Sequence, residues 1–171
     1  MKAVLISIKP KWCELIAGGK KTVEVRKTRP KLETPFKCYI YRTLPKYGDW
    51  NDKDGKVIGE FVCDKTRAFQ VFENGTVQDF FFEKLKYSCL SYDEIAEYIG
   101  KNRVGYSWHI SNLIIYDKPK ELSEFSIDCK GGCDIPYLYA PPCERCKKNK
   151  LTRPPQSWCY VEELKGAAND S

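Results

Sequence analysis

The residues with the clearest chemistry in this sequence are four cysteines toward its C-terminal end. They form the pattern Cys129-x3-Cys133, nine intervening residues, and Cys143-x2-Cys146. Two such short spacings let four thiolate sulfurs meet around one zinc ion at about 2.3 Å. Four thiolates complete the tetrahedral shell, so the ion would be structural and would hold no open position for catalysis. The spacing predicts zinc as a cofactor, one ion bound by these four residues.

Other roles are open to the same cysteines: disulfides, small buried side chains, or ligands of an iron–sulfur cluster. The chain has nine cysteines and no visible secretory signal, which argues against a disulfide framework. Iron–sulfur clusters use different typical spacings. Zinc is therefore the favoured interpretation. The remaining cysteines are expected in the core: Cys13, Cys38, Cys63, Cys89 and Cys159.

A second polar group lies in residues 21–26, where polar and apolar side chains alternate. The alternation predicts a strand with Glu24 and Arg26 on one face and Lys21 with the two valines on the other. An arginine can bind phosphate through two hydrogen bonds, and a carboxylate can accept from a base amino group. The simpler interpretation is a surface ion pair between Glu24 and Arg26, worth less than about 1 kcal/mol. The residues by themselves favour the ion pair.

Composition limits the class of protein. The chain has 171 residues, 42% hydrophobic and 30% charged, which fits one ordinary folded domain and excludes a disordered protein. Its apolar runs are far shorter than the roughly 18 residues of a membrane span, and no targeting segment is visible, so a cytoplasmic protein is expected. The first 46 residues hold 12 basic and 3 acidic side chains, which indicates a polyanionic partner.

The remaining patterns predict the elements that position these groups. Helices are expected from Pro10 to the glycine pair at 18–19, and over residues 91–99, where Ser91 and Glu94 can form a capping box. Strands are expected over residues 3–8, 21–26, 36–43, 57–69, 106–116 and 158–161. Strands and helices do not alternate regularly, so the pattern predicts an α+β fold with a small closed or partly closed sheet.

The motif around the second group resembles that of a known family. Glycine, lysine, glutamate and arginine form G-x-K-x-x-E-x-R, at Gly19, Lys21, Glu24 and Arg26. The motif follows an early strand and a helix that carries Trp12, Leu15 and Ile16 on one face. This arrangement resembles the ASCH family, in a bacterial or prophage-type member. Tyr106–Ile110 resembles a late strand of the same family, and the likeness covers residues 3–30 and 104–116.

The resemblance implies a PUA-like mixed β-barrel with inserted helices. It divides the chain into an ASCH/PUA-like barrel over residues 1–125, a zinc-ribbon-like insertion over 126–156, and a final barrel strand with a frayed tail over 157–171. It also implies a module that binds RNA, another nucleic acid or a nucleotide. The expected contact residues are Lys11, Trp12, Lys20, Lys21, Glu24, Arg26, Lys27 and Trp158. Of these, the two tryptophans are candidates for stacking on bases.

An enzymatic function is the alternative. Some relatives hydrolyse acylated cytidine with a lysine, a threonine three residues later and a separate glutamate. Lys21 matches the lysine, but Glu24 stands in place of the threonine and no carboxylate lies near Ser88. A metal-independent ribonuclease stays open, with Glu24 as base and Lys21 or Arg26 stabilising the transition state. A contact with an acidic protein is a third reading of the basic segment, and a structural role is favoured for the single histidine, His109.

Overall fold

The computed structural model describes residues 1–48, 50–77, 85–127 and 149–164. All six predicted strands and both predicted helices are present, with somewhat different ends. The elements in chain order are β1 (Lys2–Ile8), α1 (Pro10–Ala17), β2 (Val23–Arg26), β3 (Phe36–Arg42), β4 (Val57–Val71), η2 (Lys86–Ser88), α3 (Tyr92–Ile99), β5 (Arg103–Lys120), η3 (Leu122–Glu124) and β6 (Trp158–Glu162). Within the described ranges no helix is long and apolar enough to cross a membrane.

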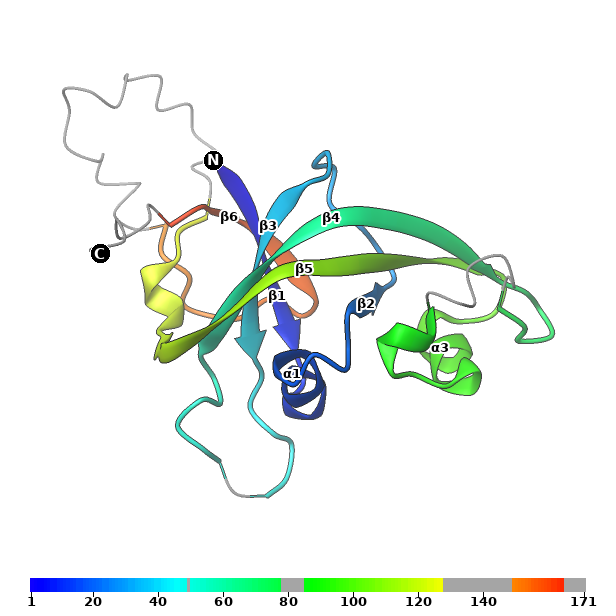
Figure 1. The fold of residues 1–171 in the computed structure, drawn as a ribbon, viewed down its shortest axis with the longest axis horizontal. Helices are drawn as coiled ribbons and strands as arrows, with labels where there is room; N and C mark the ends of the chain where they lie inside the picture. Colours follow the sequence, from blue (N-terminus) through cyan, green and yellow to red (C-terminus); the bar gives the residue numbers. More distant parts are fainter. Residues whose placement is uncertain (49, 78–84, 128–148, 165–171) are drawn as a thin grey trace.

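The strands form one mixed sheet in the order β2-β5-β4-β3-β1-β6. β1 and β3 run parallel, and the other neighbouring pairs are antiparallel. The long strands β4 and β5 curve together across the molecule, while α1 lies at one end of β1 and α3 lies under the far end of β4 and β5 (Figure 1). The predicted α+β class is therefore confirmed.

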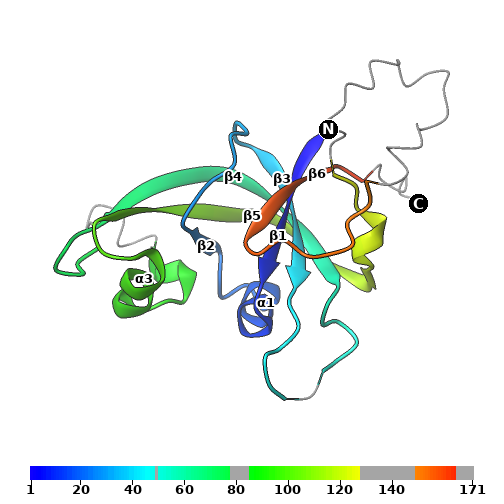
Figure 2. The ribbon, with the colours of Figure 1, turned by 180° about the vertical axis from the view of Figure 1, so that it is seen from behind.

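The predicted barrel closure is wrong, because the sheet is open. Its edges are β2 and β6, and main-chain pairing between these two strands is absent from the described residues. β2 has only four residues, and it already pairs with β5 on one side. Side chains span the remaining gap: Arg26 Nη1 donates to Ser157 Oγ at 3.4 Å, and Trp158 Nε1 donates to Thr28 Oγ1 at 3.0 Å. The open edges are visible from behind in Figure 2.

Irregular pairing between β4 and β5 bends this part of the sheet. The register shifts at three places, between Val57 and Gly59, between Glu60 and Val62, and between Cys63 and Thr66. Extra residues of this kind increase local twist and bend the bulged strand. Gly59 fits the first irregularity because a Cβ there would lie 2.4 Å from the carbonyl oxygen of Ile114. The lack of a side chain at this position allows the two backbones to approach.

Three apolar clusters form the core of the described part of the chain. The largest packs α1 against one face of β1, β3 and β4 and contains the fully buried Trp108. A second lies on the opposite face, around Tyr39 and Phe125. A third packs α3 against Val25, Phe69 and Val71. Both sides of the sheet are thus covered at its centre, and β2 is held between the first and third clusters.

The predicted capping box at α3 is confirmed and supports a first prediction. Ser91 accepts a hydrogen bond from the Glu94 main-chain N–H at 3.2 Å, and the Glu94 carboxylate accepts from the Ser91 N–H at 2.8 Å. We expect Ser91→Ala to lower the free energy of unfolding by about 1 kcal/mol, because a main-chain donor loses its partner. Urea unfolding measures this loss. Ser91→Thr is the control and should retain most of the stability; equal losses in both variants would contradict the capping role.

The cysteines divide into two groups. Cys129, Cys133, Cys143 and Cys146 lie outside the described residues. Of the five expected in the core, three are buried and two, Cys89 and Cys159, are partly exposed. All five are free thiols.

Candidate ligand-binding cleft

The G-x-K-x-x-E-x-R segment forms a cluster of three buried charged side chains. Gly19, with φ of +70°, follows the end of α1 and allows the chain to turn toward the sheet. β2 begins only at Val23. The prediction that Lys21 lies on the opposite face from Glu24 is wrong for this reason, since Lys21 precedes the strand and does not follow its alternation. The side chains of Lys21, Glu24 and Arg26 are 2%, 8% and 8% exposed.

The Glu24 carboxylate lies between the two cations. Its Oε2 atom is 3.1 Å from Lys21 Nζ, and its Oε1 atom is 3.1 Å from Arg26 Nε. Neither Glu24 Oε2 nor Arg26 Nε has a partner with hydrogen-bond geometry, and both atoms are shielded from solvent. Charge attraction in a site that excludes water therefore holds the cluster, rather than directional hydrogen bonds.

Main-chain carbonyls complete the surroundings of both cations. Lys21 Nζ donates to the carbonyl oxygens of Val23, at 2.9 Å, and Ser88, at 2.7 Å. Arg26 Nη2 donates to the Ser7 carbonyl oxygen at 2.7 Å, while Nη1 has the long 3.4 Å contact with Ser157 Oγ. Lys21 thus ties β2 to η2, and Arg26 ties β2 to β1. Arg26 Nη1 therefore has a longer hydrogen bond than the Lys21 ammonium has.

The cluster lines a cleft with a volume of about 400 Å³. A volume of this size suits a small ligand or one nucleotide unit. Trp12, partly buried, and Lys9, exposed, contribute to its wall from the start of α1 and the residue before it. The other lining residues are Ser7, Ile8, Val25, Thr43, Leu90, Tyr98, Gln156 and Ser157. Two aromatic rings, three cationic side chains and several polar groups therefore meet in one cavity.

Three other lysines predicted to contact a ligand are exposed, and none of them is part of the cleft lining. Lys11 is exposed, and its Nζ lies 4.4 Å from the centroid of the Trp12 ring. Lys27 is exposed and lies 5.3 Å from the ring of Tyr98, which lines the cleft. Lys20 is exposed and does not line the cleft. These lysines give the surroundings of the cleft a positive charge.

Trp158 lies outside the cleft lining. Its ring centroid is 6.0 Å from that of Trp108 and 5.4 Å from that of Tyr160, so it packs at the edge of the main core. Sequence reasoning missed Ser7 of β1 and Ser157, the residue before β6, which both contact Arg26. The sequence has no signal for the Ser7 contact, because it uses a main-chain carbonyl oxygen that every residue type has. It has none for the Ser157 contact, because Ser157 is 131 residues from Arg26 along the chain.

Burial makes the core thiols poor nucleophiles. It raises the pKa of Cys13 and of Cys63 to about 12, and that of Cys159 to about 11. The thiolate, which is the reactive form, is therefore scarce at neutral pH in these residues. Among the residues with described positions, no three His, Cys, Asp or Glu side chains are arranged to hold a metal ion. The cleft itself presents charged groups, hydrogen-bonding groups and aromatic rings.

Comparisons with known proteins identify the fold. No family model and no curated protein matches the sequence. The structure is similar to that of ASCH from Zymomonas mobilis, with a TM-score of 0.62, 18% identity, and coverage of 94% of this chain and 88% of the other. Two single-residue variants of that protein match with TM-scores of 0.63 at 19% and 18% identity, covering 94% and 95% of this chain and 89% and 92% of theirs. The chain therefore has the fold of ASCH proteins, as its motif indicated.

Proposed function

We propose that this protein binds RNA or a nucleotide in the cleft around Lys21, Glu24 and Arg26. The observation that carries the proposal is the presence of three charged side chains, each less than a tenth exposed, in the lining of one cavity. Burying charges is costly, and well-packed apolar side chains often stabilise a fold as well or better. Charged groups held in a cleft in this way are typical of functional sites. The ASCH-type fold agrees with this proposal.

Each group has a distinct part in the proposed binding. Arg26 Nη1 offers a donor to a phosphate or a base carbonyl, because its contact with Ser157 is long. Trp12 offers a ring on which a base can stack when the exposed Lys11 ammonium, 4.4 Å from the ring centroid, moves aside. The Glu24 carboxylate balances the two buried cations, and its Oε1 atom positions Arg26 by lying 3.1 Å from Nε. Exposed lysines such as Lys9 and Lys27 attract the polyanion toward the cleft.

A nuclease that uses the same cleft is the weaker proposal. In that mechanism Glu24 would take a proton from the attacking hydroxyl group. A general base must come within hydrogen-bond reach of that proton, whereas Glu24 is enclosed by two cations. Lys21 is likewise engaged by two carbonyl oxygens. These contacts favour binding over catalysis at this position.

We expect Trp12→Leu to weaken binding of a short single-stranded RNA by roughly 5- to 150-fold, which corresponds to the ~1–3 kcal/mol of one stacked base. Fluorescence anisotropy with labelled RNA measures the change. Trp50→Leu is the matched control, because Trp50 is 68% exposed and does not line the cleft. Equal affinity of the Trp12 variant and the parent, with the fold intact by circular dichroism, would refute binding at this cleft.

Lys27→Ala gives a second readout in the same assay. If Lys27 contacts a phosphate, the slope of log affinity against log salt concentration should become shallower by about one unit. Its exposed position makes a loss of folding stability small, within about 0.5 kcal/mol. A slope equal to that of the parent would remove Lys27 from the contact surface and leave the Trp12 result to decide the proposal.

We also propose that residues 126–156 form an insertion held by one structural zinc ion, bound by Cys129, Cys133, Cys143 and Cys146. The donor set fits zinc, because four thiolates are its typical structural ligands. The described flanks support an insertion: the Ile127 N–H donates to Asn149 at 2.9 Å, and the Leu151 N–H donates to Phe125 at 2.9 Å. The chain thus leaves and re-enters the domain at adjoining positions.

A further inference from the structure

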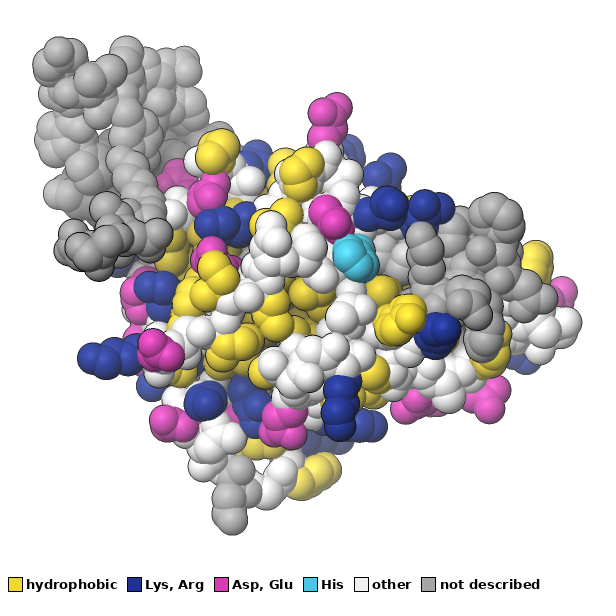
Figure 3. Space-filling view, viewed as in Figure 1, with side chains coloured by type: hydrophobic (Ala, Val, Ile, Leu, Met, Phe, Trp, Pro, Cys, Tyr) yellow, Lys and Arg dark blue, Asp and Glu magenta, His cyan; other side chains and the backbone are white. Residues whose placement is uncertain are grey.

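A second polar cavity lies on the other side of β2 from the cleft. Its volume is about 370 Å³, and its wall includes Asp64, Lys65 and Arg67 of β4 and His109 of β5. None of these residues lines the cleft around Glu24. In Figure 3 the imidazole of the single histidine stands on an open face, beside an acidic side chain and near basic ones.

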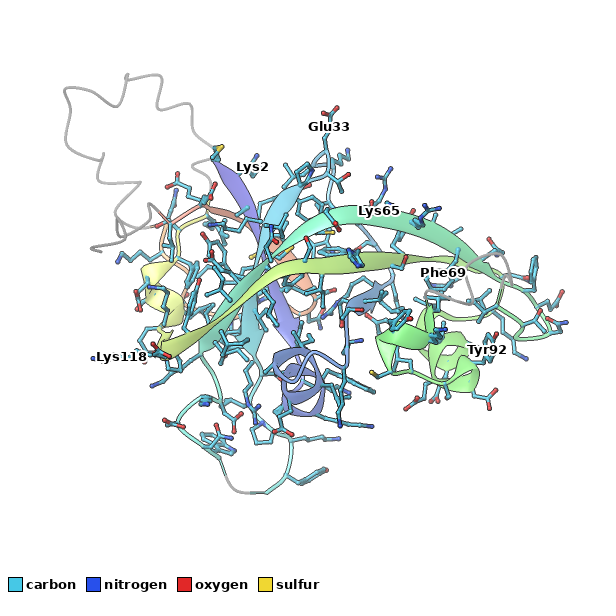
Figure 4. The ribbon with its side chains drawn as sticks, viewed as in Figure 1. Lys2, Glu33, Lys65, Phe69, Tyr92 and Lys118 are labelled. Atoms are coloured by element: carbon cyan, nitrogen blue, oxygen red, sulfur yellow. The ribbon has the colours of Figure 1, made fainter. Side chains whose placement is uncertain are left out.

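A β-bulge brings these side chains together. Cys63 pairs with Ile110, and Thr66 pairs with Trp108, so two residues of β4, Asp64 and Lys65, face the single residue His109. A bulge redirects side chains in this way and often marks a functional position. Asp64 Oδ1 lies 2.6 Å from His109 Nδ1. Lys65 stands on the same part of β4, in Figure 4.

The Asp64–His109 contact determines what the imidazole offers to a ligand. When Nδ1–H of the neutral ring donates to the carboxylate, Nε2 becomes a hydrogen-bond acceptor. Lys65 and Arg67 supply two positive charges in the same cavity. Thr22, Tyr87 and Ser107, which carry hydroxyl groups, also line the cavity. An acceptor beside two cations differs from a simple basic patch, because it adds a hydrogen-bonding partner for a hydroxyl group close to the groups that attract an anion.

We propose that this cavity is a second binding site, for a ribose phosphate group. Lys65 and Arg67 bind the phosphate, and His109 Nε2 accepts a hydrogen bond from a ribose hydroxyl group. The cavity volume falls in the usual range for small-ligand sites, roughly 300–1,000 Å³. The ligand is either a free nucleoside monophosphate or one unit of an RNA chain. The site does not depend on the function proposed for the cleft, because β2 separates the two cavities.

The single histidine makes the test specific to this cavity. The imidazole Cε1–H signal of the untagged protein can be followed by NMR during titration with adenosine monophosphate, adenosine or inorganic phosphate. We expect a saturating shift with adenosine monophosphate, and affinities at least about tenfold weaker for adenosine and for phosphate, because each lacks half of the complementary groups. Tighter binding of an RNA pentanucleotide than of adenosine monophosphate would assign the cavity to an RNA chain, and the reverse order to the free nucleotide. The DNA of the same sequence should bind more weakly than the RNA, because it lacks the 2′-hydroxyl groups.

Two variants keep this reporter in place. Lys65→Ala combined with Arg67→Met should weaken adenosine monophosphate binding about tenfold or more, since both phosphate donors are lost. Lys118→Ala is the control, an exposed lysine at the opposite end of the paired strands β4 and β5 (Figure 4), and should bind as the parent does. An imidazole signal that no ligand moves would overturn the proposal, whatever the cleft binds. Equal affinity for inorganic phosphate and adenosine monophosphate would also overturn it, as that result describes a general anion patch.

Discussion

Replacing Glu24 with alanine is expected to lower the free energy of unfolding by about 3–5 kcal/mol, because two buried cations lose the charge between them. Lys21 and Arg26 are each within 3.1 Å of the carboxylate and are 2% and 8% exposed. Little water reaches them to replace the lost interaction. Lys21 keeps its two carbonyl acceptors, so the repulsion between the two cations and the uncompensated charge of Arg26 account for most of the loss.

Urea unfolding of Glu24→Ala and of Glu33→Ala provides the comparison. Glu33 is exposed in the segment before β3, so its loss should change stability by no more than about 0.5 kcal/mol. Combining Glu24→Ala with Lys21→Met should cost less than the sum of the two single changes, because the second removes a charge that the first leaves unpaired. A loss below about 1 kcal/mol in Glu24→Ala would show that the carboxylate does not hold the cluster.

The local patterns were sufficient to predict the elements. Residues 3–8, 36–43 and 57–69 carry apolar and β-branched side chains that form strands nearly where expected, and Ser91 with Glu94 marks the start of α3. Each of these signals depends on residues close together in the sequence. The closure of the barrel depends instead on whether β2 meets β6, more than 130 residues away, and periodicity has no information on that pairing. The structure leaves these edges apart.

The candidate site was predictable only in part for the same reason. Glu24 and Arg26 are close in sequence, and strand alternation placed them on one face. Lys21 reaches them because β2 starts later than the alternation suggested. The contact of Arg26 with Ser157 spans 131 residues, and that of Asp64 with His109 spans 45. The contact between Asp64 and His109 also requires a bulge. A bulge shifts side chains out of the regular strand alternation, so a prediction that assumes regular alternation does not find this contact.

Removing the zinc ion proposed for residues 126–156 is expected to have a large effect that stays local. A structural zinc ion contributes on the order of 10 kcal/mol to the folding of its segment, so a chelator should release the proposed insertion while the sheet remains. Two main-chain hydrogen bonds, from Ile127 to Asn149 and from Leu151 to Phe125, join the flanks of this segment. Without the zinc ion the segment no longer helps to keep these flanks together. We expect the amide protons of Ile127 and Leu151 to exchange at least about 100-fold faster after chelation. Amides at the centre of β1, which pairs with β3 and β6, should exchange as before.

Metal analysis and one pair of variants decide whether this effect comes from the predicted ligands. Freshly purified protein should contain about one zinc ion per chain. Cys143→Ser should lose the ion and show the fast exchange of Ile127 without any chelator, because three thiolates and a hydroxyl group bind zinc far more weakly. Cys89→Ser is the matched control, since Cys89 lies beside η2 and outside the predicted ligand set, and it should keep a full complement of zinc. Purified protein without zinc, or Cys143→Ser with undiminished zinc, would leave residues 126–156 to be held by contacts other than a metal.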